Sequence, residues 1–172
     1  MRLSIILLTV GSLLLMACGK TAPMGPATPI VPGDILDPIL TMPQGAERTE
    51  RIVELLRKTI PRVGTDFDTL SSHTRFDEAA AAARYQNRVV VITGVRVERS
   101  WSAKEDNDGI TTAQVQSSDG MVGRGLRFGK ADEARVLELS KGSTITVSCL
   151  LTEKYLNPIG CILLMPLDQR AR

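Results

Sequence analysis

The sequence predicts a mainly β domain: a five-stranded barrel with a helix between its third and fourth strands, preceded by one or two α-helices. Two observations lead to this fold class. Residues 88–166 are rich in β-branched side chains that alternate with polar ones, as in half-buried strands. Residues 46–60 instead repeat their apolar side chains with the period of an amphipathic helix, and residues 79–83 are five consecutive alanines.

The first 17 residues predict a secretory signal peptide. Arg2 gives a positive start, and residues 3–16 form an apolar run shorter than a typical membrane span. The end of this segment, Leu15-Met16-Ala17-Cys18, resembles the bacterial lipobox. The resemblance implies cleavage before Cys18 and a lipid on its thiol, and Gly19 then implies the outer membrane of a Gram-negative bacterium. The alternative is an ordinary secretory signal with an incidental cysteine.

Composition excludes several classes of function. Removal of residues 1–17 leaves 20 basic and 19 acidic residues, which is a net charge of +1. This charge is too small for a protein that binds mainly by neutralising phosphates. One histidine and 3% aromatic residues leave little for imidazole metal sites or base-stacking surfaces, so nucleic acid is disfavoured as a partner.

Residues 18–45 predict an extended tether that carries the domain away from the membrane. Six of the nine prolines lie between residues 19 and 45, and proline both fixes φ and removes a backbone donor. The segment is more apolar than a spacer requires, and its apolar side chains can pack on the domain or on a partner. They are Ile30, Val31, Ile35, Leu36, Ile39 and Leu40.

Residues 46–87 predict a helical segment. The first helix covers 46–60 and ends at Pro61, with Ile52, Leu55 and Leu56 on one face that packs against the domain or, as the alternative, against a partner. Residues 61–73 predict a loop. The sequence Thr74-Arg75-Phe76-Asp77 resembles a capping box that opens a second helix through the alanines 79–83.

Residues 88–166 supply the barrel. Strands are predicted over 88–98, 110–117, 121–128, 143–151 and 159–165, with a bulge at Gly94, a tight hairpin at Asp119-Gly120 and a helix over 131–139. Residues 167–172 remain as a tail. Three strands, a helix and two strands form the element order of the OB-fold, a small five-stranded barrel.

Residues 76–165 resemble the bacterial tRNA-anticodon-binding-like OB-fold proteins, many of which are lipoproteins or exported proteins. The resemblance rests on Tyr85-Gln86-Asn87-Arg88, on the strand 89–95, on the stretch 139–147 and on the terminal Gly160-Cys161-Ile162-Leu163. It covers about half the chain and implies a fold, with no catalytic positions to transfer. The sequence departs from the family pattern at Gly123 and Gly125, which leave the third strand poor in side chains.

Cys149 and Cys161 are the two thiols left once Cys18 is lipidated. Antiparallel partners have a constant index sum, and here the sum centres on Tyr155, in the connection between the last two strands. The two cysteines therefore face each other across the last hairpin, at a separation that suits a disulfide. An oxidising compartment favours that bond, and two buried free thiols are the alternative.

Trp101 opens the loop between the first two strands, a loop that OB-folds use for ligands. Its indole either stacks on a ligand or folds back over the barrel. We expect the ligand surface at Trp101 and Tyr155, with Arg99 and Lys104 beside them.

Catalytic and metal sites are not expected. His73 has no nucleophile motif near it, and an EF-hand alignment of the acidic loop 105–109 puts Lys104 at the first ligand position. The sequence thus predicts a lipid-anchored envelope module without cofactor or catalysis, which binds a protein partner or an envelope glycan or peptide. The alternatives are a nucleic-acid-binding OB domain at the envelope, and a structural or stress-tolerance lipoprotein without a specific ligand.

Overall fold

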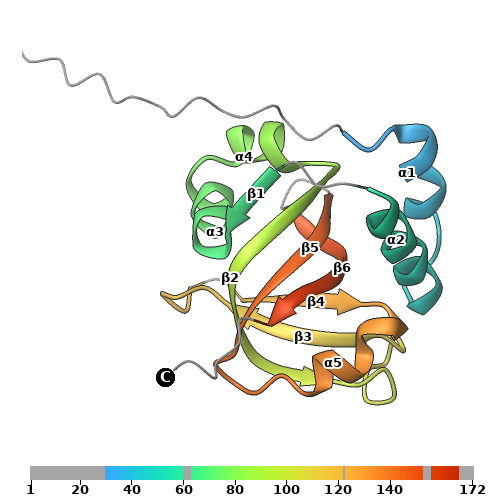
Figure 1. Cartoon of the computed structure of the whole chain (residues 1–172). Coiled ribbons are helices and arrows are strands. Elements are labelled where there is room, and N and C mark those ends of the chain that lie inside the picture. The colour runs from blue at the N-terminus through green and yellow to red at the C-terminus, as the bar shows by residue number, and fades with distance from the viewer. Residues whose placement is uncertain (1–29, 60–62, 122, 153–155, 167–172) are drawn as a thin grey trace, which may run out of the picture.

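The computed structural model describes residues 30–59, 63–121, 123–152 and 156–166, and a closed five-stranded β-barrel forms its centre (Figure 1). The barrel strands are β2 (Arg88–Trp101), β3 (Thr111–Gln116), β4 (Gly123–Phe128), β5 (Thr144–Thr152) and β6 (Asn157–Pro166). They follow the order β2-β3-β4-β6-β5, and β5 pairs with β2 to close the barrel. β4 and β6 run parallel, whereas the other neighbours run antiparallel. The predicted closed five-stranded barrel is confirmed.

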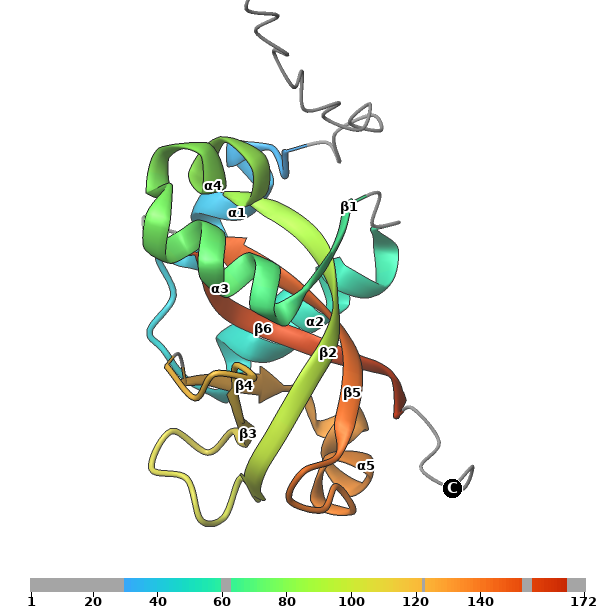
Figure 2. The same cartoon turned by 90° about the vertical axis from the view of Figure 1, so that its left-hand side faces the viewer.

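The other elements surround this barrel. They are α1 (Gly33–Leu40), α2 (Ala46–Lys58), β1 (Val63–Asp66), α3 (Phe67–Phe76), α4 (Glu78–Tyr85), the 3-10 helix η1 (Lys130–Asp132) and α5 (Glu133–Leu137). α1 and α2 lie on one side of the barrel and α3 and α4 on the opposite side (Figures 1 and 2). β1 is a sixth strand that pairs in parallel with β2, and α5 lies at the end of the barrel far from α4.

The main hydrophobic core fills the barrel and continues under α3 and α4. Alternate residues of the strands point inward, among them Leu126, Phe128 and Ile145, and all are buried. Phe67 and Tyr85 join the same cluster from α3 and α4. The helices on that side therefore share one core with the barrel, which fixes them to it.

A second hydrophobic core lies between the outer surface of the barrel and the helices α1 and α2. Leu36 and Ile52 meet Val89 and Leu150 there, and all four are buried. Gly160 of β6 makes this packing possible, because a Cβ atom at that position would lie 2.7 Å from Cγ2 of Ile52. Glycine thus lets α2 approach the sheet closely.

β2 bends so that it can pair on both sides of the barrel. Its register against β5 shifts between Ile92 and Val95, and Gly94 between them has φ of 67°, a left-handed conformation that favours glycine. The predicted bulge at Gly94 is confirmed. The last part of the strand, from Arg96 to Trp101, pairs with β3 and carries the chain toward the β2–β3 loop.

The extended tether predicted over 18–45 is wrong for residues 33–40, which form α1. Pro32 precedes the helix and imposes no break within it, while Pro38 lies inside. Burial of Leu36 against the barrel outweighs the local cost of that proline, because the side chain loses nearly all contact with water. The apolar residues of this segment therefore belong to the domain.

The loop predicted over 61–73 is wrong for residues 63–73. The count of one or two helices before the barrel and a purely helical segment over 46–87 are wrong as well. Residues 63–66 form β1 and residues 67–76 form α3, so the described chain has four α-helices ahead of the barrel. The side chain of Asp66 caps α3 by accepting a hydrogen bond from the Thr69 backbone N–H at 2.8 Å. Phe67 and Leu70 then anchor the helix in the core.

Two smaller predictions need correction. The capping residue of α4 is Asp77, whose carboxylate accepts from the Ala80 N–H, whereas the Thr74 hydroxyl donates to the Leu70 carbonyl within α3. The helix predicted over 131–139 is shorter and begins as η1. The predictions for residues 1–17, for Cys18 and for residues 167–172 fall outside the described residues.

Candidate functional site

Strand register places polar side chains in a row on the outer face of the barrel. Trp101 pairs with Thr112 and Thr112 pairs with Arg127, so these three residues cross β2, β3 and β4 side by side. The next row holds Arg99, Gln114 and Gly125. Because adjacent strands are about 4.8 Å apart, Trp101 and Arg127 flank a surface about 10 Å wide.

A pocket of about 570 Å³ opens over this face. One wall is the β2–β3 loop, the opposite wall is the start of α2 with the residues before it, and the start of β6 closes a third side. The lining residues are Gln44, Gly45, Arg48, Thr49, Trp101, Asp106, Asp108, Thr112, Gly123, Arg124, Gly125, Arg127, Asn157, Pro158 and Ile159. Polar side chains that can donate or accept hydrogen bonds thus dominate the pocket.

Hydrogen bonds and ion pairs hold the charged side chains of the pocket in place. Arg127 Nη2 lies 3.2 Å from Asp108 Oδ2, which ties β4 to the β2–β3 loop. Arg124 Nη1 donates to Asn157 Oδ1 at 2.9 Å and so joins β4 to the start of β6. The Thr112 hydroxyl donates to Asp106 Oδ2 at 3.1 Å. Polar groups therefore connect β3 and β4 to the β2–β3 loop and β4 to the start of β6.

Local electrostatics fit a preformed pocket. Burial lowers the pKa of the Arg124 guanidinium, because the charged form has lost part of its hydration. In the β2–β3 loop, the backbone N–H and the hydroxyl of Ser102 donate to Glu105, and these two bonds hold the pKa of that carboxyl below its usual range. The loop that follows Trp101 is thus fixed by its own hydrogen bonds.

The structure separates the residues of the predicted ligand surface. Trp101 lines the pocket, half-buried on the outer face. Arg99 lies with its guanidinium carbon 4.9 Å from the Trp101 ring centre, in a cation–π contact. Lys104 is exposed in the β2–β3 loop and does not line the pocket. Tyr155 lies outside the described residues.

Four side chains of the pocket were not predicted from the sequence: Arg48, Arg124, Arg127 and Asn157. A signal for two of them exists in Gly123-Arg124-Gly125-Leu126-Arg127, where arginines are interleaved with glycines along one strand. Arg48 and Asn157 carry no such signal, because they reach the pocket from α2 and β6 through tertiary packing.

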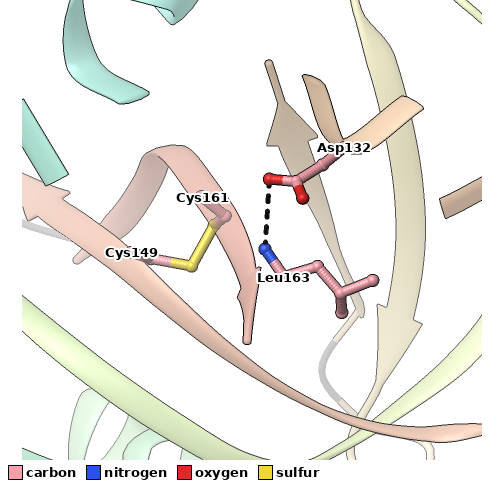
Figure 3. The surroundings of a disulfide bond; sticks show 4 residues. All are labelled: Asp132, Cys149, Cys161 and Leu163. Carbon is pink, nitrogen blue, oxygen red and sulfur yellow. Dashed lines mark hydrogen bonds between the residues drawn. A yellow bond between two sulfur atoms is a disulfide. The ribbon is translucent and has the colours of Figure 1, made fainter. Parts of the chain in front are cut away.

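A disulfide joins Cys149 and Cys161 across the last hairpin, with an S–S distance of 2.04 Å (Figure 3). The two residues are direct partners of β5 and β6 and both are buried, in agreement with the index sum. Nearby, Asp132 Oδ2 accepts from the Leu163 N–H at 3.4 Å, and Arg135 donates to both Asp132 and the Leu163 carbonyl. This network attaches η1 and α5 to β6.

His73, the histidine considered as a catalytic residue, has local partners. His73 Nδ1 lies 3.2 Å from the Tyr85 hydroxyl, which also donates to Thr65. Within the described ranges, no group of three or more His, Cys, Asp or Glu residues is arranged to hold a metal ion. In the same part of the chain, no helix combines the length and apolarity required to cross a membrane.

Comparison of the chain with known protein families, with curated proteins and with solved structures finds no match. The resemblance to the anticodon-binding-like proteins therefore stays a prediction.

Proposed function

We propose that the five-stranded barrel is an OB-fold and that the protein uses it to bind a ligand. The order β2-β3-β4-β6-β5, with β5 back on β2 and β4 parallel to β6, supports this assignment. OB-folds bind ligands on the face of their second and third strands and in the loops that join strands one to two and four to five. The pocket occupies that face, over β3 and β4.

The function is that of an envelope binding module that recognises a protein partner or an envelope glycan or peptide, without catalysis. The single observation that carries it is the polar pocket lined by Trp101 on the ligand face of the barrel. An indole at the edge of a polar pocket offers a flat apolar surface together with an N–H donor, which suits a sugar ring or a peptide side chain.

A lipid on Cys18 anchors the module to the outer membrane of a Gram-negative bacterium in this proposal. The lipobox-like end of the first 17 residues supports the anchor. The described chain begins at residue 30, at the end of the barrel that carries α4, whereas the β2–β3 loop lies at the other end (Figures 1 and 2). The pocket wall formed by that loop thus lies at the end of the barrel away from residue 30.

Site-specific photo-crosslinking in native envelopes tests the binding function. A crosslinking amino acid replaces Gln44, an exposed residue of the pocket wall, and the matched control replaces Glu138, an exposed residue at the end of α5. We expect a discrete adduct from position 44 and none from position 138. Equal adducts from both positions, or none from position 44, would contradict the proposal. Recovery of nucleic acid from position 44 would instead favour a nucleic-acid-binding domain.

Mass spectrometry of the mature N-terminus tests the anchor. We expect the lipid mass on Cys18 and release of the Cys18→Ser variant into the soluble fraction, because one removed thioether removes the attachment point. An unmodified Cys18, or cleavage at another residue, contradicts the anchor and leaves the pocket proposal standing.

A further inference from the structure

The two walls of the pocket carry opposite charges. The wall formed by the β2–β3 loop carries Trp101 and the carboxylates Asp106 and Asp108, and Asp108 already pairs with Arg127. The wall formed by α2 carries Arg48, a half-buried residue in the first turn of the helix. Within the described residues, Arg48 forms no ion pair or side-chain hydrogen bond. Its guanidinium therefore faces a ligand space with its donors available.

Arg124 brings a second guanidinium to the same space. It lies three residues before Arg127 on β4, so the two side chains leave opposite faces of the strand, and that of Arg124 reaches the pocket beside Asn157 of β6. Its Nη1 donates to Asn157, and its positive charge attracts a negative group of a ligand in the pocket. Because the group is half-buried, a negative partner interacts with it more strongly than in bulk water.

The floor between these walls is flat. Gly123 and Gly125 carry no side chain, and a Cβ atom at either position would meet its nearest neighbour only at 3.8 or 3.5 Å. The bare strand is bordered by Trp101 on one side and by the arginines on another. A rigid ring about as wide as one sugar can lie against these two residues, because neither glycine projects a side chain into the pocket.

Peptide recognition fits the same walls less well. β3 is paired on both sides, whereas β4 pairs with β6 only at Phe128. The Arg124–Asn157 hydrogen bond spans the gap between the starts of β4 and β6, so an extended peptide could join β4 there only by displacing that bond. A helical peptide needs an apolar groove, and the apolar side chains of the lining are limited to Trp101, Pro158 and Ile159.

We propose that the ligand is an acidic sugar, a pyranose ring bearing a carboxylate, with its ring on the Gly123–Gly125 floor beside Trp101 and its carboxylate against Arg48 and Arg124. This inference rests on the proposed binding function of the pocket. The carboxylate takes the planar, two-oxygen acceptor role that guanidinium groups recognise in bidentate fashion. The ring hydroxyls pair with the carboxylates and amides of the remaining lining.

Titration of the full-length mature protein in detergent micelles tests the inference. The probes are a tetrasaccharide of glucuronic acid and the same tetrasaccharide with its carboxyls reduced to alcohols, and the readout is the fluorescence of Trp101, the single tryptophan of the sequence, with calorimetry alongside. We expect the acidic form to bind at least about tenfold more tightly than the reduced form, because one charge-assisted pair contributes that much. The preference should shrink as salt is added.

Four variants locate the effect. Arg48→Gln and Arg124→Gln should each lower the preference for the acidic form about tenfold, whereas Arg57→Gln, on an exposed position later in α2, should leave it unchanged. Arg48→Lys keeps the charge and should retain part of the preference. Circular dichroism checks that each variant is folded, and Arg48→Gln decides the test if Arg124→Gln is not.

Each of the other possible results of these titrations rejects one part of the proposal. If the acidic and reduced sugars bind equally and Trp101→Ala abolishes both, the pocket binds a glycan but does not recognise its carboxylate. Binding of a tetraglutamate peptide without binding of either sugar rejects the sugar and keeps a peptide module. Absence of binding to all three probes rejects the acidic-sugar inference, and the crosslinking from position 44 then decides separately whether the pocket binds anything.

Discussion

At the scale of single residues, glycines decide how closely other groups approach the barrel. Gly123 and Gly125 leave the pocket floor bare, and Gly160 admits Ile52 of α2 against β6. The same residue type thus creates a space on one face of the barrel and removes a gap on another. Both effects come from the missing Cβ atom, which sets how near a neighbouring group can lie.

Gly160→Ala should therefore destabilise the protein. The added methyl would lie 2.7 Å from Cγ2 of Ile52, so α2 or β6 must shift, at a cost of about 1–3 kcal/mol. Gly64→Ala in β1 is the matched control, since its added Cβ meets its nearest atom at 3.9 Å and should change stability by less than about 1 kcal/mol. Urea unfolding measures both variants, and equal effects would contradict the close approach of α2.

Asp66 gives a residue-scale prediction with a pH dependence. The Thr69 hydroxyl and backbone N–H donate to its carboxylate and hold its pKa below the ordinary 3.8. The lowered pKa means that the stabilisation is present above pH 3.8 and is lost as the pH falls through the folded value. Asp66→Ala should cost about 1 kcal/mol at neutral pH and progressively less below pH 3.8.

Asp66→Asn separates the capping bond from the charge. Asparagine is also a good N-cap, so this variant should keep most of the stability at neutral pH. Its stability should then lack the acid-dependent part that the wild-type carboxylate contributes. Thermal unfolding at a series of pH values compares the three proteins, and an unchanged pH profile in both variants would contradict the role of Asp66.

At the scale of elements, the packing of α1 and α2 on the barrel positions one wall of the pocket. Their shared core with β2, β5 and β6 fixes the connection that carries Gln44 and the first turn of α2 that carries Arg48. A free tether could not hold these residues opposite the β2–β3 loop. The helices ahead of the barrel therefore contribute to the site as well as to stability.

Leu36 and Ile35 provide a test of this packing. The two residues are neighbours in α1, but Leu36 is 1% exposed and Ile35 is 46% exposed. Leu36→Ala should destabilise the protein by about 2–5 kcal/mol, because it leaves a cavity in the second core. Ile35→Ala should change stability by less than about 0.5 kcal/mol. Denaturant unfolding measures both variants. Equal effects of the two substitutions would contradict the packing of α1 against the barrel.

At the scale of the whole molecule, closure of the barrel depends on pairs that are far apart in sequence. β5 pairs both with β2, about 60 residues earlier, and with β6, and the Cys149–Cys161 disulfide lies between β5 and β6. A covalent bond at this place restricts the unfolded chain over a loop of 12 residues. The disulfide therefore supports the part of the barrel that completes last along the chain.

Replacement of both cysteines by alanine should lower the free energy of unfolding by about 2–4 kcal/mol. Both sulfurs are buried, so a reductant should reach the wild-type bond slowly under native conditions and rapidly in denaturant. Thiol labelling with and without urea, together with unfolding curves of the double variant, measures both effects. Rapid labelling of the native wild-type protein would contradict the buried position.

The sequence by itself determined those features that depend on nearby residues. Alternation of β-branched side chains predicted the barrel strands, Gly94 predicted the bend in the first of them, and the index sum of the cysteines predicted their pairing. Each of these follows from the period of a strand or from the geometry of one hairpin, which a short stretch of sequence contains.

Only the tertiary structure decided how distant segments combine. α1 forms in a proline-rich stretch because Leu36 is buried by β2 and β5, and α3 forms where a loop was expected because Phe67 and Leu70 enter the barrel core. The pocket likewise assembles Arg48, Trp101, Arg124 and Asn157 from four separate elements. Burial against residues far along the chain outweighs local propensity, and this energy has no signature in the local sequence.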